Sequence, residues 1–326
     1  MSGQKNGQRP LNHTRQDTDS HLSAVISCEK IARHNNKMNS VLQRFCLITI
    51  ALQLGACSMA ELTVKASMPM IEGGMLALNR ETDLQLAEAA MPPNIELMEG
   101  MIINAPNNSE LRNHAAQAYY GYAYGFVEDT NAQRAASLYR RGLKHALYNL
   151  QQLGISKNLL SSNLASLQIK LNSLDEDDIA PLFWAASNWA KWIDHNRDKP
   201  EAIADLPKAV MIMQRVLELD ENFFMAGPHL FFAVYYGSRS PMLGGDYKRS
   251  AKHFEKARKI NNDNLLLVDL LQAEYLDRQK FDQQSFNQRL KKILNADADT
   301  LEDIALINNI AKRKASNLLN KESQWF

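Results

Sequence analysis

The chain has 326 residues, of which 45% are hydrophobic and 22% are charged, and its formal net charge at neutral pH is +1. This composition is ordinary for a globular protein and provides enough apolar side chains for a sizeable core. The near-zero net charge and the lack of a Lys/Arg run argue against a nucleic-acid-binding protein.

The stretch MNSVLQRFCLITIALQLGACS, which begins at Met38, has the order of a secretory signal. A basic residue precedes an apolar run at 45–54, and small residues lead to Cys57. The run is far shorter than the roughly 20 residues that a membrane-spanning helix needs. Its end, LGAC, resembles a bacterial lipobox and predicts lipidation of Cys57. An ordinary signal peptide with a chance cysteine and a buried apolar helix are the alternatives.

The sequence therefore divides into three parts. Residues 1–37 are polar and unpatterned, and we interpret them as a non-native extension, because a secretory signal should begin at the chain start, or as a disordered segment. Residues 38–56 are the predicted lipoprotein signal peptide, and residues 57–326 are the predicted mature domain. Ser58 follows the cysteine, and no Asp stands there to favour the inner membrane. We expect an anchor in the outer membrane, facing the periplasm.

Helical signals dominate the mature part. Strand signals are almost absent, whereas the helix formers Ala, Leu, Met, Gln and Lys are abundant throughout. Asp83 and the acidic run 175–178 mark helix starts, and the acidic run lacks the spacing of a calcium loop. The predicted helices cover 61–78, 82–90, 93–104, 109–127, 131–153, 157–171, 179–194, 201–219, 223–237, 246–260, 264–277, 282–294 and 299–320.

Many short helices in series suggest an array of helical hairpins. With Tyr119 at position 4 of a 34-residue tetratricopeptide (TPR) unit, the positions for large and small side chains are filled by Tyr122, Ala123, Phe126, Ala135, Tyr139 and Gly142. The repeat is degenerate, because long inserts at 194–206 and 237–248 separate the helices of two hairpins. The sequence predicts an all-α fold of TPR-like helical-hairpin repeats that form a superhelical domain. A non-repeating helical domain is the alternative.

No catalytic constellation emerges from the sequence. The five histidines of the mature part are scattered, and none forms H-E-x-x-H or another close metal pair. The motifs G-x-S-x-G, Walker A and G-x-G-x-x-G are also missing. LGGD at 243–246 predicts a tight turn with a helix N-cap rather than a phosphate loop. We expect no catalytic residue, no metal and no cofactor.

Aromatic side chains are the better candidates for function. In a TPR superhelix, positions 2, 5, 9 and 12 of the first helix face the inner groove, and in this register they are Gln117, Tyr120, Tyr124 and Val127. The other aromatic residues of YYGYAYGF, at 119–126, are assigned to packing between helices.

The stretch PLFWAASNWAKWID carries three tryptophans on one predicted helix. With Trp184 at position 4 of the unit, Trp189 and Trp192 turn inward. With Phe183 at that position, Trp184 and Asn188 turn inward instead. Core packing is the alternative for each single residue. The candidate groove or ligand-lining residues are Tyr120, Tyr124, Trp184, Asn188, Trp189 and Trp192.

Several stretches, in order, resemble a known family: NIELMEGMIINAPNN, AYGFVED, RAASLYRRG, PLFWAASNWAKWID and HLFFAVYYGSRSPMLGGDYKRSAKHFEKA. Together they resemble the T-component proteins associated with TRAP transporters, from about Ala60 onward. The resemblance implies a periplasmic lipoprotein with a TPR-like helical fold that partners the soluble solute-binding protein of a TRAP system. A trimer with hydrophobic channels is associated with the family. The resemblance supplies no motif-defined catalytic residue.

The leading hypothesis is a lipid-anchored periplasmic TPR-like accessory protein of a TRAP-type transport system. It would bind a solute-binding protein and hold an apolar or carboxylated small solute on its inner face. A general envelope scaffold that binds an extended peptide is the second hypothesis, and an uncharacterised enzyme is the third.

Overall fold

The computed structural model describes the backbone of residues 40–161 and 163–326, and nearly all side chains from Glu61 onward. Residues 61–326 form one compact unit. The predicted extension at 1–37 lies outside the described residues. The side chains of the predicted signal peptide and of Cys57 also lie outside them.

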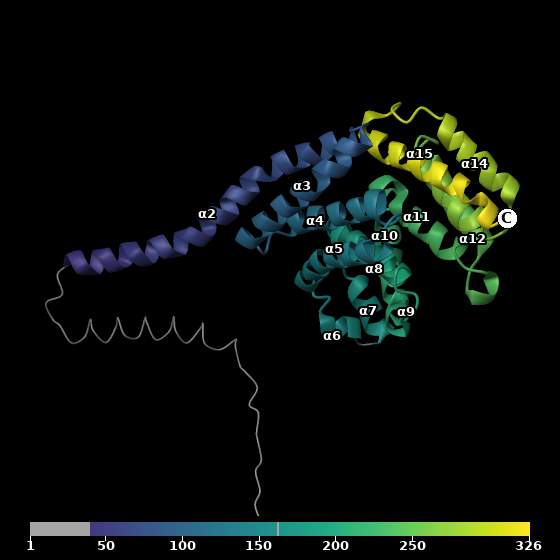
Figure 1. Ribbon diagram of the computed structural model, residues 1–326. Coiled ribbons are helices and arrows are strands. Elements are labelled where there is room, and N and C mark those ends of the chain that lie inside the picture. The colour runs from purple at the N-terminus through teal and green to yellow at the C-terminus, as the bar shows by residue number, and fades with distance from the viewer. Residues whose placement is uncertain (1–39, 162) are drawn as a thin grey trace, which may run out of the picture. The chain divides into compact units, whose positions relative to one another are not determined.

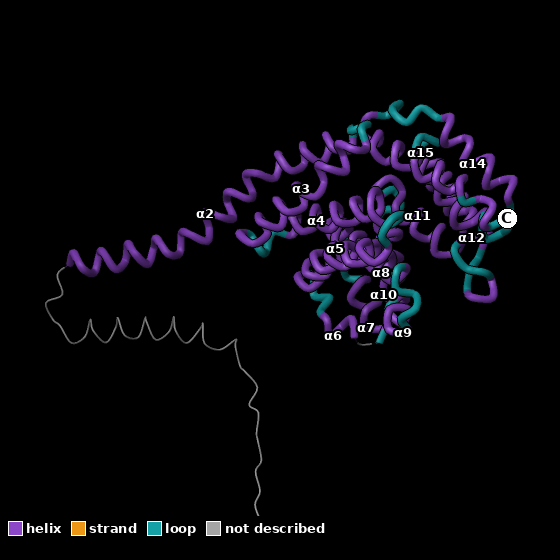
Figure 2. The backbone as a smooth tube through the Cα atoms, in the orientation of Figure 1, coloured by secondary structure: helices purple, strands orange, loops and turns teal. Residues whose placement is uncertain are grey.

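The described residues contain helices and no strand, which confirms the all-α prediction (Figure 2). The helices of the first half are α2 (Ser40–Asn79), α3 (Leu84–Asn104), α4 (Ser109–Tyr122), α5 (Ala132–Gln152), α6 (Lys157–Ser161), α7 (Leu164–Leu171) and α8 (Ile179–Asp194). Those of the second half are α9 (Pro200–Ala204), α10 (Leu206–Leu219), α11 (Phe223–Gly237), α12 (Tyr247–Ile260), α13 (Leu266–Gln272), α14 (Gln283–Asn295) and α15 (Ala305–Asn320).

The expected helix starts are present. Asp83 caps α3 by accepting hydrogen bonds from the backbone N–H groups of Gln85 and Leu86. Asp246 caps α12 in the same way, and Gly244 before it adopts a left-handed conformation with φ 83°. The predicted tight turn and N-cap at LGGD are therefore confirmed, because glycine reaches this conformation without steric cost.

The structure joins or divides the predicted helices differently in three places. The structure joins 82–90 and 93–104 into α3, which continues through Pro92 and Pro93. Each proline removes one N–H donor, but buried side chains on both sides, Met91 and Ile95, hold the helix against the core. The predicted helices 157–171 and 201–219 each divide into two shorter helices, α6 with α7 and α9 with α10.

The start of α11 is not helical. Phe224, Met225 and Ala226 have φ angles of 47°, 58° and 62°, in the left-handed region that side chains rarely adopt. The regular helix begins at Pro228, where a missing N–H is harmless. The carbonyl of Met225 accepts a hydrogen bond of 2.9 Å from the Asn261 side chain, which helps to fix this turn.

Two helices end in π-helical segments, which hold one residue more per turn than an α-helix. The segment η1 (Ala123–Val127) continues α4, and η4 (Ala273–Asp277) continues α13. Such segments are rare and are frequent at functional sites. Both carry side chains that line the cavity described below.

Helices that follow one another in the sequence pack together, as α4 with α5, α11 with α12, and α14 with α15. Figure 1 shows α14 and α15 side by side. The last helix also returns to the first ones: α15 contacts α3, and the Arg313 guanidinium donates to the Gly125 carbonyl. Both ends of the unit therefore contribute to one interior.

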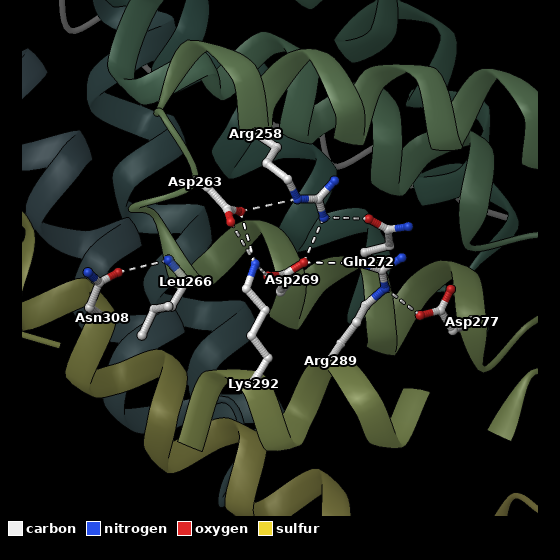
Figure 3. A network of polar contacts seen from close by, with 9 residues as sticks. All are labelled: Arg258, Asp263, Leu266, Asp269, Gln272, Asp277, Arg289, Lys292 and Asn308. Carbon is white, nitrogen blue, oxygen red and sulfur yellow. Dashed lines mark hydrogen bonds and ion pairs between the residues drawn. The ribbon is translucent and has the colours of Figure 1, made fainter. Parts of the chain in front are cut away.

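A network of ion pairs joins α12, α13, η4 and α14 (Figure 3). Asp269 is 3% exposed, and its carboxylate accepts from Arg258 at 2.6 Å, Arg289 at 3.1 Å and Lys292 at 2.8 Å. Burial raises the pKa of Asp269, but the hydrogen bonds from Lys292 and Arg258 outweigh it and hold this pKa below its usual value. Each oxygen of this carboxylate is hydrogen-bonded, as a buried charge requires.

None of the helices among the described residues has the length and hydropathy of a bilayer-spanning segment.

Candidate ligand-binding cavity

A cavity of about 850 Å³ lies among α2, α3, α4, α8, α11, α13 and α15, and it opens to the surface where exposed residues such as Met70 and Leu243 line it. Its lining is mainly apolar, and its volume is within the range typical of small-molecule sites. The last helix closes against the first ones, so side chains from both ends of the unit line the same space.

One wall of the cavity is aromatic. Trp184 is central to it, with ring centroids 5.8 Å from Tyr120, 4.9 Å from Phe183 and 4.8 Å from Phe224. The left-handed turn at the start of α11 places Phe224 here, and Gly227 allows the approach because an added Cβ would lie 2.6 Å from the Phe183 ring.

Methionines from α2 and α3 form much of another wall. The methionines that line the cavity are Met70, Met75, Met91, Met98, Met101 and Met225. Methionine is flexible and polarisable, so it adapts to ligands of different shape. The cavity therefore combines a stiff aromatic wall with a deformable one.

The tyrosines of YYGYAYGF occupy two different environments. Tyr120 and Tyr124 line the cavity, and their rings stack with centroids 6.3 Å apart. Tyr119 and Tyr122 are buried in the neighbouring helix interface and do not line it. The 3.6-residue period of the helix produces this division.

Of the other candidates, only Trp184 lines the cavity. Asn188 is fully buried, and its amide donates to the carbonyls of Ala116 at 3.2 Å and Trp184 at 2.9 Å. Trp189 is buried in the core between α8 and its neighbours, and Trp192 is half-buried against two core clusters. These three side chains have packing positions.

Neither register proposed for this helix describes α8. Its cavity face includes Trp184, Ser187, Lys191 and Asp194. Because successive residues turn by about 100° around a helix, Trp189 and Trp192 point away from this face, whereas Asn188 lies at its edge and is held there by two backbone carbonyls.

One end of the cavity, where Lys191 and Tyr124 line it, adjoins a polar cluster whose other members lie behind the lining. The Lys191 ammonium lies 2.7 Å from Glu128, and the Lys314 ammonium lies 3.1 Å from Glu128 and 2.7 Å from Asp129. The Tyr139 hydroxyl donates to Glu128 at 2.7 Å. Burial raises the pKa of Glu128, but Lys191 opposes this most strongly and the pKa ends well below its usual value. Glu128 therefore stays ionised and is shared by two lysines.

Tyr124, in η1, stands between these lysines. The Lys314 and Lys191 ammonium nitrogens lie 4.5 Å and 5.3 Å from its ring centroid. The side chain is 8% exposed, and its hydroxyl is buried without a hydrogen-bond partner among the described residues. Burial, and next the Glu128 charge, raise the pKa of Tyr124 well above its usual value, so the hydroxyl keeps its proton.

A second cavity, of about 280 Å³, shares four lining residues with the first, including Tyr275 and Arg197. Glu274 and Arg278 also line it. Burial raises the pKa of Glu274 above its ordinary value. The π segment η4 supplies Glu274 and Tyr275, whose side chains sequence reasoning did not select.

Two histidine clusters form elsewhere. Glu72, Glu110 and His114 bring one ligand atom each within 4.8 Å of one another, a proximity that their sequence spacing does not reveal. Exposed carboxylates often gather in this way, and we assign no metal to them. His229 and His253 share a 2.8 Å contact between their Nδ1 atoms. Burial, and next the neighbouring His229, lower the pKa of His253 to about 4.

The fold and the site define a class: an all-helical protein with a large, mainly apolar cavity that adjoins a polar cluster at one end. The chain belongs to the TRAP transporter T-component family, whose model matches residues 80–326. This match confirms the resemblance seen in the sequence and identifies the chain with a component of TRAP transport. A search of curated proteins found no match.

Proposed function

We propose that the protein is a lipid-anchored periplasmic accessory protein of a TRAP-type transport system. It binds the soluble solute-binding protein of that system and holds an apolar or carboxylated small solute in the 850 Å³ cavity. Family membership supports the transport role. The cavity is the observation that carries the solute claim, because its size and apolar lining suit a small molecule.

The proposal is one of binding rather than catalysis. The charged groups on the cavity wall include Lys191, which is paired with Glu128 behind the lining, and Asp194 and Arg197, which are paired with each other. Part of the proposal is that the hairpins follow a TPR-like superhelical order, in which Tyr120 and Tyr124 face the inner surface. A homotrimer is also part of it, and light scattering of the purified protein would show a mass of three chains.

Native mass spectrometry of protein purified from detergent-solubilised membranes tests the solute claim. We expect a bound small molecule that unfolding releases. Protein that is repeatedly empty, with tryptophan fluorescence indifferent to added apolar acids, would contradict the claim.

Co-purification from the same membranes tests the partner claim. We expect the solute-binding protein of a TRAP system in the eluate. Recovery of unrelated envelope proteins in its place would favour the peptide-binding scaffold.

The anchor has its own test. Acylation of Cys57 predicts that the wild-type protein fractionates with outer membranes and that Cys57→Ser releases it. Equal fractionation of both proteins would contradict the lipid anchor.

A further inference from the structure

The Tyr124 hydroxyl is buried, yet it makes no hydrogen bond within the described residues. A buried hydroxyl without a partner destabilises a protein relative to one that is hydrogen-bonded. The neighbouring phenol of Tyr139 is bonded to Glu128 at 2.7 Å, whereas that of Tyr124 has no partner within the described part of the chain. Tyr124 is more than nine-tenths buried and lines the cavity.

The backbone at this place is also unusual. Tyr124 belongs to η1, and Tyr275 on the shared wall of the two cavities belongs to η4. Both π-helical segments of the described residues therefore contribute a tyrosine to the cavity lining. A π segment shifts the register of the side chains that follow it, and proteins retain such segments most often at functional sites.

The free donor and the lysines beside it suit an acceptor group. The charged residues that line the larger cavity are three cations, Lys191, Arg197 and Arg239, and two carboxylates, Asp194 and Asp303. Glu128 pairs with Lys191 from behind the lining, so the wall is neutral when this carboxylate is counted. Lysines lie against the Tyr124 ring, so a cationic ligand at this ring would face like charge.

We propose that Tyr124 and Lys191 form a head-group site for a single carboxylate, and that the apolar tail of the ligand lies against the methionines of α2 and α3. The Tyr124 hydroxyl donates a hydrogen bond to the carboxylate, and the Lys191 ammonium, shared with Glu128, balances its charge. This inference rests on the proposed function and specifies which end of the solute binds where.

Displacement of the neutral fluorescent probe N-phenyl-1-naphthylamine tests the site. The full-length protein in detergent is loaded with the probe and titrated with dodecanoate or with dodecylamine, which have the same chain but opposite charge. We expect dodecanoate to displace the probe at a concentration at least about tenfold lower than dodecylamine requires.

Tyr124→Phe should weaken displacement by dodecanoate about tenfold or more, the loss expected for a hydrogen bond to a charged group. The affinity of each variant for the neutral probe is measured first, so that displacement is converted into an affinity for dodecanoate. Tyr122→Phe is the matched control, because it removes a phenol oxygen from the same helix outside the cavity, and it should leave dodecanoate displacement unchanged.

Three results would overturn the assignment. Equal displacement by dodecanoate and dodecylamine would remove the charge preference. Wild-type behaviour of Tyr124→Phe would remove the hydroxyl as the donor. In both cases the probe still binds, so the cavity keeps its proposed function. Failure of wild-type protein to bind probe or dodecanoate would contradict the solute claim and the head-group site together.

Discussion

Two polar regions lie in the interior of this protein, and they differ in one respect. Around Asp269, three cations satisfy one buried carboxylate. At the polar end of the cavity, Glu128 is satisfied in a similar way, but the adjacent Tyr124 hydroxyl is not. Buried polar groups are almost always paired. Other buried side-chain atoms of the described residues also have no partner, but the Tyr124 hydroxyl belongs to a residue that lines the cavity, and the proposed head-group site rests on this.

We expect the largest effect on stability at Asp269. Asp269→Ala should lower the free energy of unfolding by about 3–5 kcal/mol, because it removes the buried carboxylate that three partly exposed cations share. Urea denaturation measures this. The control is Asp263→Asn, which removes a charge that pairs with two of the same cations but is half exposed, and which suits the left-handed backbone at this position, φ 62°. It should cost less than about 1 kcal/mol, and an equal cost for both would show that burial is not the cause.

We expect a smaller effect on stability at Gly142, where the helices pack closely. Gly142→Ala would place a Cβ 2.5 Å from the Asn188 side-chain oxygen and 3.1 Å from the Ala116 carbonyl. It should destabilise the protein by about 1–3 kcal/mol through overpacking, measured by thermal unfolding. Gly100→Ala is matched to it, because this exposed helical position has no neighbour within 4 Å. That variant should stabilise the protein by about 1 kcal/mol; destabilisation there would point to a backbone cause.

The His229–His253 pair should make the stability of the protein depend on pH. The folded pKa of His253 is about 4, below the value of roughly 6.5 in an unfolded chain. The folded state therefore binds fewer protons between these values, so stability is present above pH 6.5 and is lost as the pH falls towards 4. His253→Phe, which can still pack against Phe232 and Tyr236, should flatten the free energy of unfolding in this window. An unchanged slope would exclude His253 as its source.

The smallest effect on stability belongs to Tyr124. Tyr124→Phe removes a hydroxyl that makes no protein hydrogen bond, so the free energy of unfolding should change by less than about 0.5 kcal/mol or rise. Tyr139→Phe removes a donor to the ionised Glu128 and should cost about 1.5–3 kcal/mol. Denaturant unfolding without added ligand measures both. Equal costs would mean that the Tyr124 hydroxyl has a structural partner after all.

The helical period allows part of this interior to be predicted from the sequence. The alternation in YYGYAYGF separates Tyr119 and Tyr122, which are buried between helices, from Tyr120 and Tyr124, which line the cavity. Helix caps such as Asp83 were readable for a similar reason, since the capping residue acts on its immediate neighbours.

Features that depend on tertiary contacts could not be predicted from the sequence. The continuation of α3 through two prolines depends on packing against the core. The positions of Asn188, Trp189 and Trp192 depend on which face of α8 meets the cavity, and the sequence allowed two registers, neither of which occurs. The π segments, which bring Tyr124 and Tyr275 to the cavity lining, have no sequence signature that we recognise. Lys191 had one signal, as a lysine within a strongly apolar helix.

A crystal structure of the protein with dodecanoate tests the central claim most directly. We expect one acyl chain inside the cavity. A carboxylate oxygen of the ligand should lie within hydrogen-bonding distance of the Tyr124 hydroxyl, and the tail of the ligand should lie against the methionines of α2 and α3. A carboxylate at the methionine end, or a chain bound only outside the cavity, would contradict it.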